Sequence, residues 1–380
     1  MRILLIPDKF KGSLTAQGVI DALKCGVKKA CPKADFVSVL ASDGGDGFLK
    51  AISQNIVCTE IHLNTLDPLG RKIKSNYLLD EKGGRAFIEL AKASGLELLS
   101  PKERSAMDTT TYGTGLEIKD ALDQGITEIY IGLGGSATND AGMGMAAAFG
   151  YRFLDSYGNE LEPIGKNLSR VASIESTDVS LPSDFSVFAV NDVDNPLFGK
   201  NGAAHTYAKQ KGATDKQIEK LDSGLKHFSE VVKKEMAVDA AFDTGSGAAG
   251  GTAYGLRTFL AAEFISGIDF VMNVAGVTKL LEEKKFDYII TGEGKFDDQT
   301  LNGKLVQGVV KMGSHYNIPV LAVCGQLEID HENLQAMGIE AALEVSDTDK
   351  SLAYNMAHAR RLIEKKIYDH FMKIQHFGTT

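Results

Sequence analysis

The chain has 380 residues, of which 43% are hydrophobic and 24% are charged, an ordinary composition for a globular protein. This length is too great for one typical hydrophobic core, so we predict two domains. The formal net charge of -9 argues against a nucleic-acid-binding or anionic-membrane-binding protein, because both kinds of partner require a basic face. An anionic ligand would instead be bound by a few local lysines and backbone N–H groups.

Other features of the sequence predict a cytoplasmic protein with small-molecule ligands. No apolar run approaches the roughly 18 residues of a membrane span, and the apolar start at residues 3–6 is too short for a signal peptide. The cysteines, Cys25, Cys31, Cys58 and Cys324, have no metal-binding or redox spacing. We therefore expect no nucleic-acid or membrane partner, and the sequence leaves the oligomeric state open.

Short apolar runs alternate with helical patterns along the chain. The runs occupy residues 3–6, 36–40, 129–133, 286–290, 319–323 and 341–345. A loop rich in Gly, Asp or Ser follows each run, and the first loop leads to a predicted helix from about Thr15 to Ala30. Continuous apolar strands that alternate with helices indicate a parallel sheet covered on both faces.

The remaining segments differ in character and predict a second domain. Residues 59–100 alternate apolar and polar positions around a turn at 66–70, which indicates antiparallel strand pairs. We therefore predict an α/β protein in which a flavodoxin- or Rossmann-like parallel-sheet domain, built from separated segments, carries a second, inserted α/β domain. The predicted first domain comprises residues 1–58, 105–150 and 283–380, and the second comprises residues 59–104 and 151–282.

Polar residues follow the predicted strands at the carboxyl edge of the sheet, where open parallel sheets bind ligands. The residues that we expect along such strand ends are Asp8, Lys9, Lys11, Asp43, Asp46, Ser136, Thr138, Asn139, Asp140, Asp192, Asp194, Glu293, Lys295 and Asp297. Carboxylate, hydroxyl and amide oxygens suit Mg²⁺, which would also offset the repulsion among these acids. The alternative is that Asp and Gly at such positions only form turns and cap helices.

Two glycine-rich stretches are candidate phosphate-binding loops. Residues 134–144 read Gly-Gly-Ser-Ala-Thr-Asn-Asp-Ala-Gly-Met-Gly, and residues 245–255 read Gly-Ser-Gly-Ala-Ala-Gly-Gly-Thr-Ala-Tyr-Gly. Glycine lets the backbone approach a phosphate, and a helix N-terminus supplies oriented N–H donors. Together the stretches indicate a nucleotide and a second anionic ligand. For the second stretch, the alternative is close helix packing through small residues.

Several familiar signatures are absent from the sequence. The chain contains no G-x-x-x-x-G-K-[ST] loop, no protein-kinase motif set and no complete dinucleotide fingerprint. It also lacks an H-E-x-x-H pair and a G-x-S-x-G elbow. These absences leave a metal-assisted transfer reaction between small, anionic, oxygen-rich ligands.

Six motifs, in the expected order, resemble those of the bacterial type I glycerate kinases. They occupy residues 7–16, 42–47, 134–142, 191–197, 245–251 and 291–297, so the resemblance covers almost the whole chain. It implies ATP-dependent phosphorylation of D-glycerate, usually at the 2-hydroxyl, with Mg²⁺, in a cleft between a flavodoxin-like domain and a second α/β domain. Two positions depart from the usual pattern: Lys9 stands where serine is common, and Asp46 where glutamate is common.

This reaction gives the motif residues expected roles. Because phosphoryl transfer requires positioning and neutralisation of negative charge, Lys11 and Lys295 are predicted partners of carboxylate or phosphate groups. Asp140, Asp192 and Asp194 are predicted catalytic residues, as metal ligands or as the base that accepts the substrate's proton. The predicted substrate- or phosphate-binding residues are Gly134, Gly135, Ser136, Thr138, Asn139, Asp8, Lys9, Asp43, Asp46, Glu293 and Asp297. The predicted nucleotide-binding residues are Gly245, Ser246, Gly247, Gly250 and Gly251.

Other functions remain open from the sequence. One is a kinase for another small hydroxy acid or sugar, or one that forms 3-phosphoglycerate. Another is a sensor that binds a sugar acid without turnover. The residues also leave open which glycine loop binds ATP, although we favour residues 245–251.

Overall fold

The computed structural model describes residues 1–40, 47–176, 179, 181–182, 184–296 and 304–377. The chain divides into two compact units: Met1–Ser42 with Val271–Thr380, here unit 1, and Asp43–Phe270, here unit 2. Unit 1 therefore contains both ends of the chain, as the sequence predicts. Within the described ranges, no helix is long and apolar enough to cross a membrane.

Unit 1 is built on a five-stranded parallel sheet with the strand order β13-β12-β11-β1-β2. Numbered within the unit, this is the 2-1-3-4-5 order of flavodoxin-like folds. The strands are β1 (Arg2–Pro7), β2 (Asp35–Ser38), β11 (Tyr288–Phe296), β12 (Val320–Leu327) and β13 (Ala341–Glu344). The helices are α1 (Ala16–Ala30), α10 (Val277–Glu283), α11 (Lys304–Tyr316), α12 (His331–Met337), α13 (Leu352–Ala357) and α14 (Ala359–Phe377).

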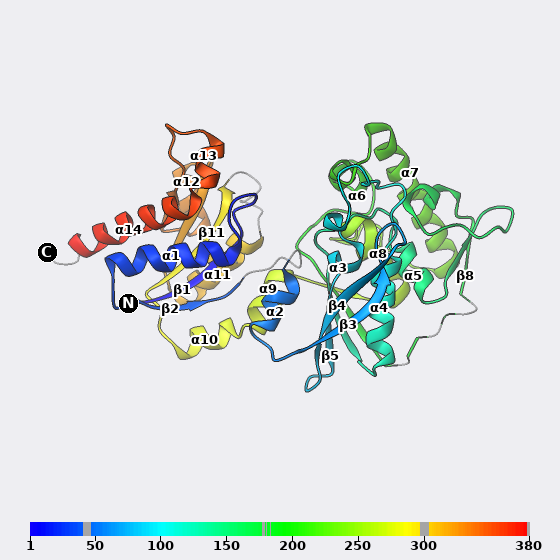
Figure 1. Ribbon diagram of the computed structural model, residues 1–380, viewed down its shortest axis with the longest axis horizontal. Coiled ribbons are helices and arrows are strands. Elements are labelled where there is room, and N and C mark those ends of the chain that lie inside the picture. The colour runs from blue at the N-terminus through cyan, green and yellow to red at the C-terminus, as the bar shows by residue number, and fades with distance from the viewer. Residues whose placement is uncertain (41–46, 177–178, 180, 183, 297–303, 378–380) are drawn as a thin grey trace. The chain divides into compact units, whose positions relative to one another are not determined.

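Helix α1 shows how the local sequence builds unit 1. The hydroxyl of Thr15 accepts a hydrogen bond from the Gly18 N–H at 3.1 Å and so caps the predicted helix. The apolar face is buried, and it includes Val19, Leu23 and Val27. Helix α14 lies beside α1 (Figure 1), and a β-carbon at Gly26 would lie 2.5 Å from the carbonyl oxygen of Glu364. Glycine at this position therefore permits the close approach of the two helices.

Unit 2 is built on a six-stranded mixed sheet with the order β10-β9-β6-β5-β4-β3. The strands are β3 (Thr59–Leu66), β4 (Lys72–Asp80), β5 (Arg85–Glu89), β6 (Glu128–Gly132), β9 (Ser186–Val190) and β10 (Glu263–Ile265). A separate antiparallel pair consists of β7 (Arg152–Leu154) and β8 (Ser173–Glu175). The α-helices are α2 (Phe48–Ser53), α3 (Ala91–Ser94), α4 (Tyr112–Asp123), α5 (Met143–Ala148), α6 (Ala203–Tyr207), α7 (Asp215–Met236) and α8 (Ala248–Leu260). The 3-10 turns are η1 (Leu96–Leu98), η2 (Gly165–Arg170) and η3 (Lys209–Lys211), and α9 (Gly267–Val274) contains the boundary between the units.

The predicted antiparallel strands are confirmed in unit 2. Strand β3 pairs with β4 from Thr59↔Leu79 to Leu66↔Lys72, and β4 pairs with β5 in the same antiparallel sense. In the turn, Asp67 accepts a hydrogen bond from the Arg71 N–H at 2.9 Å. This local bond explains why the turn signal in the sequence was reliable.

The domain assigned to residues 105–150 is wrong. We predict that this segment joins the sheet at the two ends of the chain, but β6 pairs in parallel with β5 on one side and with β9 on the other. Both hydrogen-bonding edges of β6 are thus occupied inside unit 2. A continuous apolar strand pattern indicates burial on two faces but does not specify the neighbouring strands, so the sequence could not decide the sheet. The domain boundaries also differ from the prediction. Residues 43–58 belong to unit 2, and residues 271–282 belong to unit 1.

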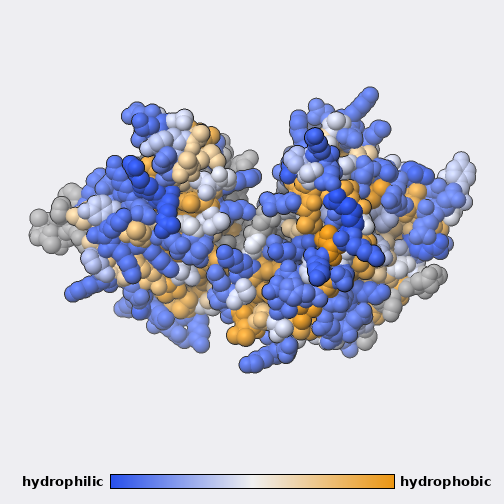
Figure 2. Space-filling model, in the orientation of Figure 1, coloured by the Kyte–Doolittle hydropathy of each residue, from blue (hydrophilic) through white to orange (hydrophobic). Residues whose placement is uncertain are grey.

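Figure 2 shows the hydropathy of one face of each unit. In the face drawn in Figure 2, hydrophilic residues cover most of the surface and apolar residues are exposed in small groups. The apolar side chains are instead concentrated in the cores. In unit 2 the core includes Ile129 and Ile131 from β6 and Val187 and Ala189 from the neighbouring strand β9.

Candidate functional site

The loop that follows β6 is held along one side by the end of α3. The Leu96 N–H donates to the carbonyl oxygen of Gly135 at 2.8 Å, and the Ala137 N–H donates to the carbonyl oxygen of Ser94 at 2.9 Å. These two bonds form an antiparallel bridge between short segments. The loop at residues 134–140 is therefore an ordered part of unit 2 at the carboxyl end of a parallel strand, where the sequence predicts a ligand site.

The first residues of this loop present hydrogen-bond donors. In the part of the chain that the structure describes, the N–H groups of Gly134, Gly135 and Ser136 are not paired with protein acceptors. Gly135 is exposed and has a φ of 71°, a left-handed conformation that favours glycine. The role of these three residues in binding a ligand stays a prediction.

Thr138 and Asn139, which follow Ala137 in the loop, are fully buried. Among the described residues, the Thr138 hydroxyl and both polar atoms of the Asn139 amide have no hydrogen-bond partner. Buried polar groups in native proteins are nearly always paired with protein, water or ligand atoms. These residues therefore mark an internal polar region beneath the loop, but their burial does not fit direct contact with a substrate.

Asp140 has a different environment from the one that its predicted role requires. Its side chain is 0% exposed, and its carboxylate accepts hydrogen bonds from the backbone N–H and the hydroxyl of Thr111, both at 2.8 Å. It also accepts from the N–H groups of Gly142 at 3.2 Å and Gly144 at 3.1 Å. Burial raises the pKa of Asp140, while these hydrogen bonds oppose that rise. The carboxylate thus joins the Thr111 loop to the start of α5, and the predicted role as base or metal ligand does not fit this burial.

The second glycine-rich loop packs against the first. The Ala141 N–H donates to the carbonyl oxygen of Gly250 at 3.2 Å. A β-carbon at Gly250 would lie 2.0 Å from the carbonyl oxygen of Thr138, and one at Gly255 would lie 2.7 Å from the α-carbon of Gly142. Glycine is required here because backbone atoms of the other loop occupy the space of a side chain.

The residues predicted to bind a nucleotide are all buried. They are Gly245, Ser246, Gly247, Gly250 and Gly251. A β-carbon at Gly247 would lie 2.3 Å from the carbonyl oxygen of Pro196, and the Ser246 hydroxyl donates to the carbonyl oxygen of Ala240 at 2.5 Å. The structure therefore supports the packing alternative for this loop, and direct contact of these five residues with a nucleotide does not fit their burial.

The loop after β9 contains two aspartates with different environments. Asp192 accepts hydrogen bonds from the Ser266 hydroxyl at 2.9 Å and from the Ile268 N–H at 3.0 Å, so it caps the start of α9. Asp194 is exposed. The described residues contain no group of three or more His, Cys, Asp or Glu side chains that could hold a metal ion. The predicted metal site of Asp140, Asp192 and Asp194 therefore does not assemble.

Lys211 is the residue at this site that the sequence analysis missed. Its side chain is 2% exposed, and its ammonium group donates to the Ser136 hydroxyl at 2.6 Å and to the carbonyl oxygen of Thr138 at 2.7 Å. In the sequence it belongs to a charged stretch that also contains Lys209, an exposed residue. The charge pattern does not distinguish these two lysines, because only the tertiary fold places one of them under the loop.

Unit 1 brings several predicted residues together at the carboxyl edge of its sheet. Strands β1 and β11 are adjacent and parallel, with Pro7 opposite Gly292, so Asp8 and Glu293 follow at the same edge. The Asp8 N–H donates to the carbonyl oxygen of Gly292 at 2.8 Å. The residues near this edge are Asp8, Lys9, Lys11, Glu293 and Lys295. The predicted gathering of strand-end residues is therefore confirmed for this part of unit 1.

Two details of this edge differ from the prediction. Glu293 and Lys295 lie within β11, which continues to Phe296 opposite Leu327, rather than in a loop after residue 290. Gly325 permits this extension, because a β-carbon there would lie 2.4 Å from the carbonyl oxygen of Gly294. Lys295 forms an ion pair with Glu328 at 2.8 Å. Three further predicted residues, Asp43, Asp46 and Asp297, lie outside the described residues.

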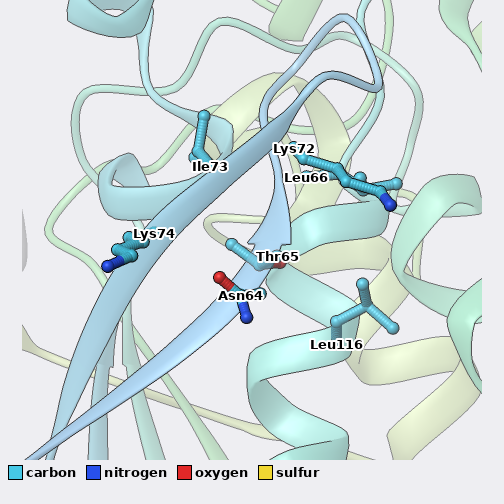
Figure 3. Close-up of a pocket in the computed structure, with 7 residues that line it drawn as sticks. All are labelled: Asn64, Thr65, Leu66, Lys72, Ile73, Lys74 and Leu116. Atoms are coloured by element: carbon cyan, nitrogen blue, oxygen red, sulfur yellow. The ribbon is translucent and has the colours of Figure 1, made fainter.

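A groove in unit 2 contains none of the predicted site residues. Its volume is about 430 Å³, and its lining comes from β3, β4 and α4 (Figure 3). The lining residues are Asn64, Thr65, Leu66, Lys72, Ile73, Lys74 and Leu116. The Thr65 hydroxyl already donates to the carbonyl oxygen of Gly113 at 2.8 Å, so it stabilises the hairpin against α4. We assign this groove no role in the reaction.

The fold and the loops define an α/β protein whose ligand-binding candidates lie at the ends of parallel strands. Residues 3–375 match the model of the glycerate kinase family. A protein named glycerate 2-kinase from Escherichia coli strain K12 is 39% identical over 348 residues, which cover 91% of this chain and 90% of that protein. A glycerate kinase from Halalkalibacterium halodurans is 37% identical over 96% of this chain and 95% of its own length.

A solved structure gives the same result. A crystal structure from Salmonella typhimurium LT2, described provisionally as glycerate kinase 2, matches with a TM-score of 0.81 and 35% sequence identity. The match covers 100% of both chains. The chain belongs to the glycerate kinase family, and it is an enzyme of that class.

Proposed function

We propose that the enzyme transfers the γ-phosphoryl group of ATP to the 2-hydroxyl of D-glycerate, giving 2-phosphoglycerate and ADP. The similarity to the Escherichia coli protein named glycerate 2-kinase supports the choice of hydroxyl. We also propose a cytoplasmic location for the enzyme, because the proposed substrate ATP is made and used in the cytoplasm. In the reaction, the glycerate oxygen bonds to the γ-phosphorus, the bond to the β-phosphate oxygen breaks, and the hydroxyl proton passes to a base.

The loop at residues 134–136 is the observation that carries this proposal. It presents unpaired N–H groups in the described chain, and the Ser136 hydroxyl is held by the buried Lys211. Oriented backbone N–H groups bind carboxylate and phosphoryl oxygens without adding net charge. Such a site suits an acidic protein that binds two anionic substrates. We infer that this loop binds either the glycerate carboxylate or the transferred phosphoryl group.

Lysines of unit 1 supply the positive charge in this proposal. Lys11 and Lys295 are exposed at the carboxyl edge of the sheet, and Lys295 is also paired with Glu328. Lysine is a common phosphate ligand and acts as a point charge. We propose that both lysines neutralise charge on the phosphates or on the glycerate carboxylate as the phosphoryl group is transferred.

Of the three predicted catalytic aspartates, Asp194 is the exposed one. The Asp140 carboxylate is buried and accepts four hydrogen bonds, and the Asp192 carboxylate caps α9. Mg²⁺ is usually held by one or two carboxylates together with substrate phosphates and water. Asp194 fits such a limited contribution, and Mg²⁺ bound there with ATP would neutralise phosphate charge. We alternatively infer that Asp194 accepts the hydroxyl proton.

The test measures the reaction and its product. Release of ADP is followed with D-glycerate, L-glycerate, lactate, tartronate and erythronate, each with ATP and Mg²⁺, and the product is identified by phosphorus and carbon NMR. We expect turnover to be fastest with D-glycerate and the phosphoryl group to be on the 2-oxygen. A 3-phosphoglycerate product would refute the choice of hydroxyl. Heat of glycerate binding without ADP release would instead indicate a sensor.

A further inference from the structure

Lys211 occupies a position where a charged side chain is costly. It is the last residue of η3, and its side chain is 2% exposed. Within the described residues, its ammonium group donates to two neutral groups, the Ser136 hydroxyl and the carbonyl oxygen of Thr138. An apolar side chain of similar length would fill the same space without the loss of hydration. The burial of a lysine here therefore calls for a role that depends on its hydrogen bonds.

The chemistry of the ammonium group determines how the Ser136 hydroxyl is oriented. A charged lysine has three N–H donors and no acceptor, so in the Lys211–Ser136 bond the hydroxyl oxygen must accept. The hydroxyl proton of Ser136 then points to a different partner. Since the neighbouring N–H groups of Gly134 and Gly135 are also donors without protein acceptors in the described chain, an anionic oxygen is the complementary ligand.

The second hydrogen bond of Lys211 holds the backbone of the loop. Its acceptor, the carbonyl oxygen of Thr138, is also the atom against which Gly250 packs. On the other side of the loop, the Thr109 hydroxyl donates to the carbonyl oxygen of Ala137 at 3.0 Å. Loss of the Lys211 bond would leave these other anchors in place. It would loosen the segment next to Ser136 without removing the whole loop from unit 2.

We propose that Lys211 is a positioning residue for the kinase reaction, in which its ammonium group holds the Ser136 hydroxyl as a donor toward an anionic oxygen of the substrate. This inference rests on the proposed function of the loop at residues 134–136. It assigns to Lys211 an indirect role, because the lysine acts through Ser136 and does not touch the substrate.

The charge of Lys211 gives this role a distinctive pH dependence. Burial lowers the pKa of Lys211 to about 7, and the nearby Asp140 carboxylate opposes that shift. Arg104 also lies close, because its carbonyl group packs against Gly212. As pH rises through 7, Lys211 in the free enzyme loses its proton, and its neutral amine can then accept a hydrogen bond from the Ser136 hydroxyl. We therefore expect kcat/KM to fall above about pH 7 and kcat to fall at a higher pH, since a bound anion favours the ammonium form.

The variants separate positioning from a merely structural role. Lys211→Met removes the donor and keeps the volume, whereas Lys211→Arg keeps a charge that does not titrate in this range. Ser136→Ala removes the hydroxyl alone. Lys209→Met is the matched control, because Lys209 belongs to the same 3-10 turn but is 77% exposed and forms an ion pair with the exposed Asp215 at 3.3 Å.

We expect Lys211→Met to melt at or above the temperature of the parent and to lose about 10²-fold in kcat/KM for D-glycerate or ATP. Ser136→Ala should cause a similar loss, and the double variant should lose no more than the worse single variant, because the two residues act as one unit. The alkaline fall in kcat/KM near pH 7 should disappear in Lys211→Met. Lys211→Arg should keep part of the activity without that fall, and Lys209→Met should match the parent.

Several results would overturn the proposal. A folded Lys211→Met enzyme with parental kcat/KM and an unchanged pH profile would do so, as would independent, multiplicative losses in the double variant. If Lys211→Met does not fold, full activity of Ser136→Ala would overturn it equally well. A parent enzyme that releases no ADP with D-glycerate would refute the proposed function itself, and this result is distinguishable because it concerns the unmodified chain.

Discussion

The α-carbon of Gly250 faces the carbonyl oxygen of Thr138 so closely that a β-carbon at Gly250 would lie 2.0 Å from that oxygen. The contact joins the two glycine-rich loops of unit 2. Gly250 also has a φ of 69°, and it stands between two other left-handed residues, Ala249 and Gly251. Both the steric contact and the backbone conformation therefore favour glycine at this position.

We predict that Gly250→Ala loses about 3 kcal/mol or more of the free energy of unfolding, because the methyl group forces the loops apart. Gly158→Ala is the matched control in unit 2. Gly158 has a φ of 80°, but a β-carbon there would meet no atom within 4 Å. Its variant should lose only about 1–2 kcal/mol from the left-handed conformation. Urea unfolding measures both values, and equal losses in the two variants would contradict the importance of the loop contact.

Asp140→Asn should destabilise the enzyme without creating a metal dependence. One carboxylate oxygen would be replaced by an NH₂ group that faces N–H donors, so buried hydrogen bonds would be lost. We expect a loss of about 2 kcal/mol or more in the free energy of unfolding. Activity should fall together with stability, and it should not recover at high Mg²⁺. Parental melting combined with recovery of turnover by Mg²⁺ would restore the role of metal ligand that the sequence predicts.

Asp194→Asn should have the opposite signature. Asp194 is exposed, so the variant should melt like the parent. If the carboxylate accepts the substrate's proton, kcat should fall by roughly 10²-fold or more at all Mg²⁺ concentrations. If it helps to hold Mg²⁺, part of the loss should be recovered at higher Mg²⁺. Near-parental turnover at ordinary Mg²⁺ would place the chemistry elsewhere, with Asp8, Asp43 and Asp297 as the next residues to test.

Glu117 should make the stability of the enzyme depend on pH. It lies in α4 with 0% exposure, accepts a hydrogen bond from the Ser75 hydroxyl at 2.5 Å, and has a pKa that burial raises to about 8. Between about pH 4.5 and pH 8 the folded state therefore binds more protons at this group than the unfolded state. Its contribution to stability is fully present below the unfolded pKa and is lost as pH rises toward 8.

The test is Glu117→Gln, which keeps the shape of the side chain and removes its titration. The stability of this variant relative to the parent should increase with pH across that window, by at most about 1.4 kcal/mol per pH unit. Denaturant unfolding at several pH values measures the difference. Parallel stability curves for parent and variant would show that Glu117 is already ionised in the folded protein.

Lys295 and Glu328 test whether an ion pair or a ligand contact matters at the edge of the unit 1 sheet. The two side chains are 44% and 55% exposed, and exposed pairs contribute only about 0.2–1 kcal/mol. Lys295→Met and Glu328→Gln should therefore both leave the melting temperature nearly unchanged. We expect Lys295→Met alone to reduce kcat/KM, by about 10-fold or more, because it removes a charge that we propose for phosphate or carboxylate binding. Equal kinetic losses would assign the effect to the ion pair.

Much of the local structure was determined by the sequence alone. The apolar runs, the cap at Thr15 and the turn at Asp67 predicted strands, a helix and an antiparallel hairpin that the structure contains. These features depend on residues close together in the chain, through side-chain periodicity and short-range hydrogen bonds. The grouping of Asp8 with Glu293 was also predictable, because parallel strands present their carboxyl ends at one edge.

Only the tertiary structure decided which polar residues are buried and hold the loop, and which polar residues are exposed. Asp140 and Asp194 have the same side chain and similar positions after a strand, yet one accepts four hydrogen bonds in the interior and the other is exposed. Lys209 and Lys211 differ in the same way. Burial depends on the segments that pack around a residue, and those segments come from distant parts of the chain. For the same reason, the sequence predicted β6 as a strand, but hydrogen bonding to β5 and β9 decided its sheet.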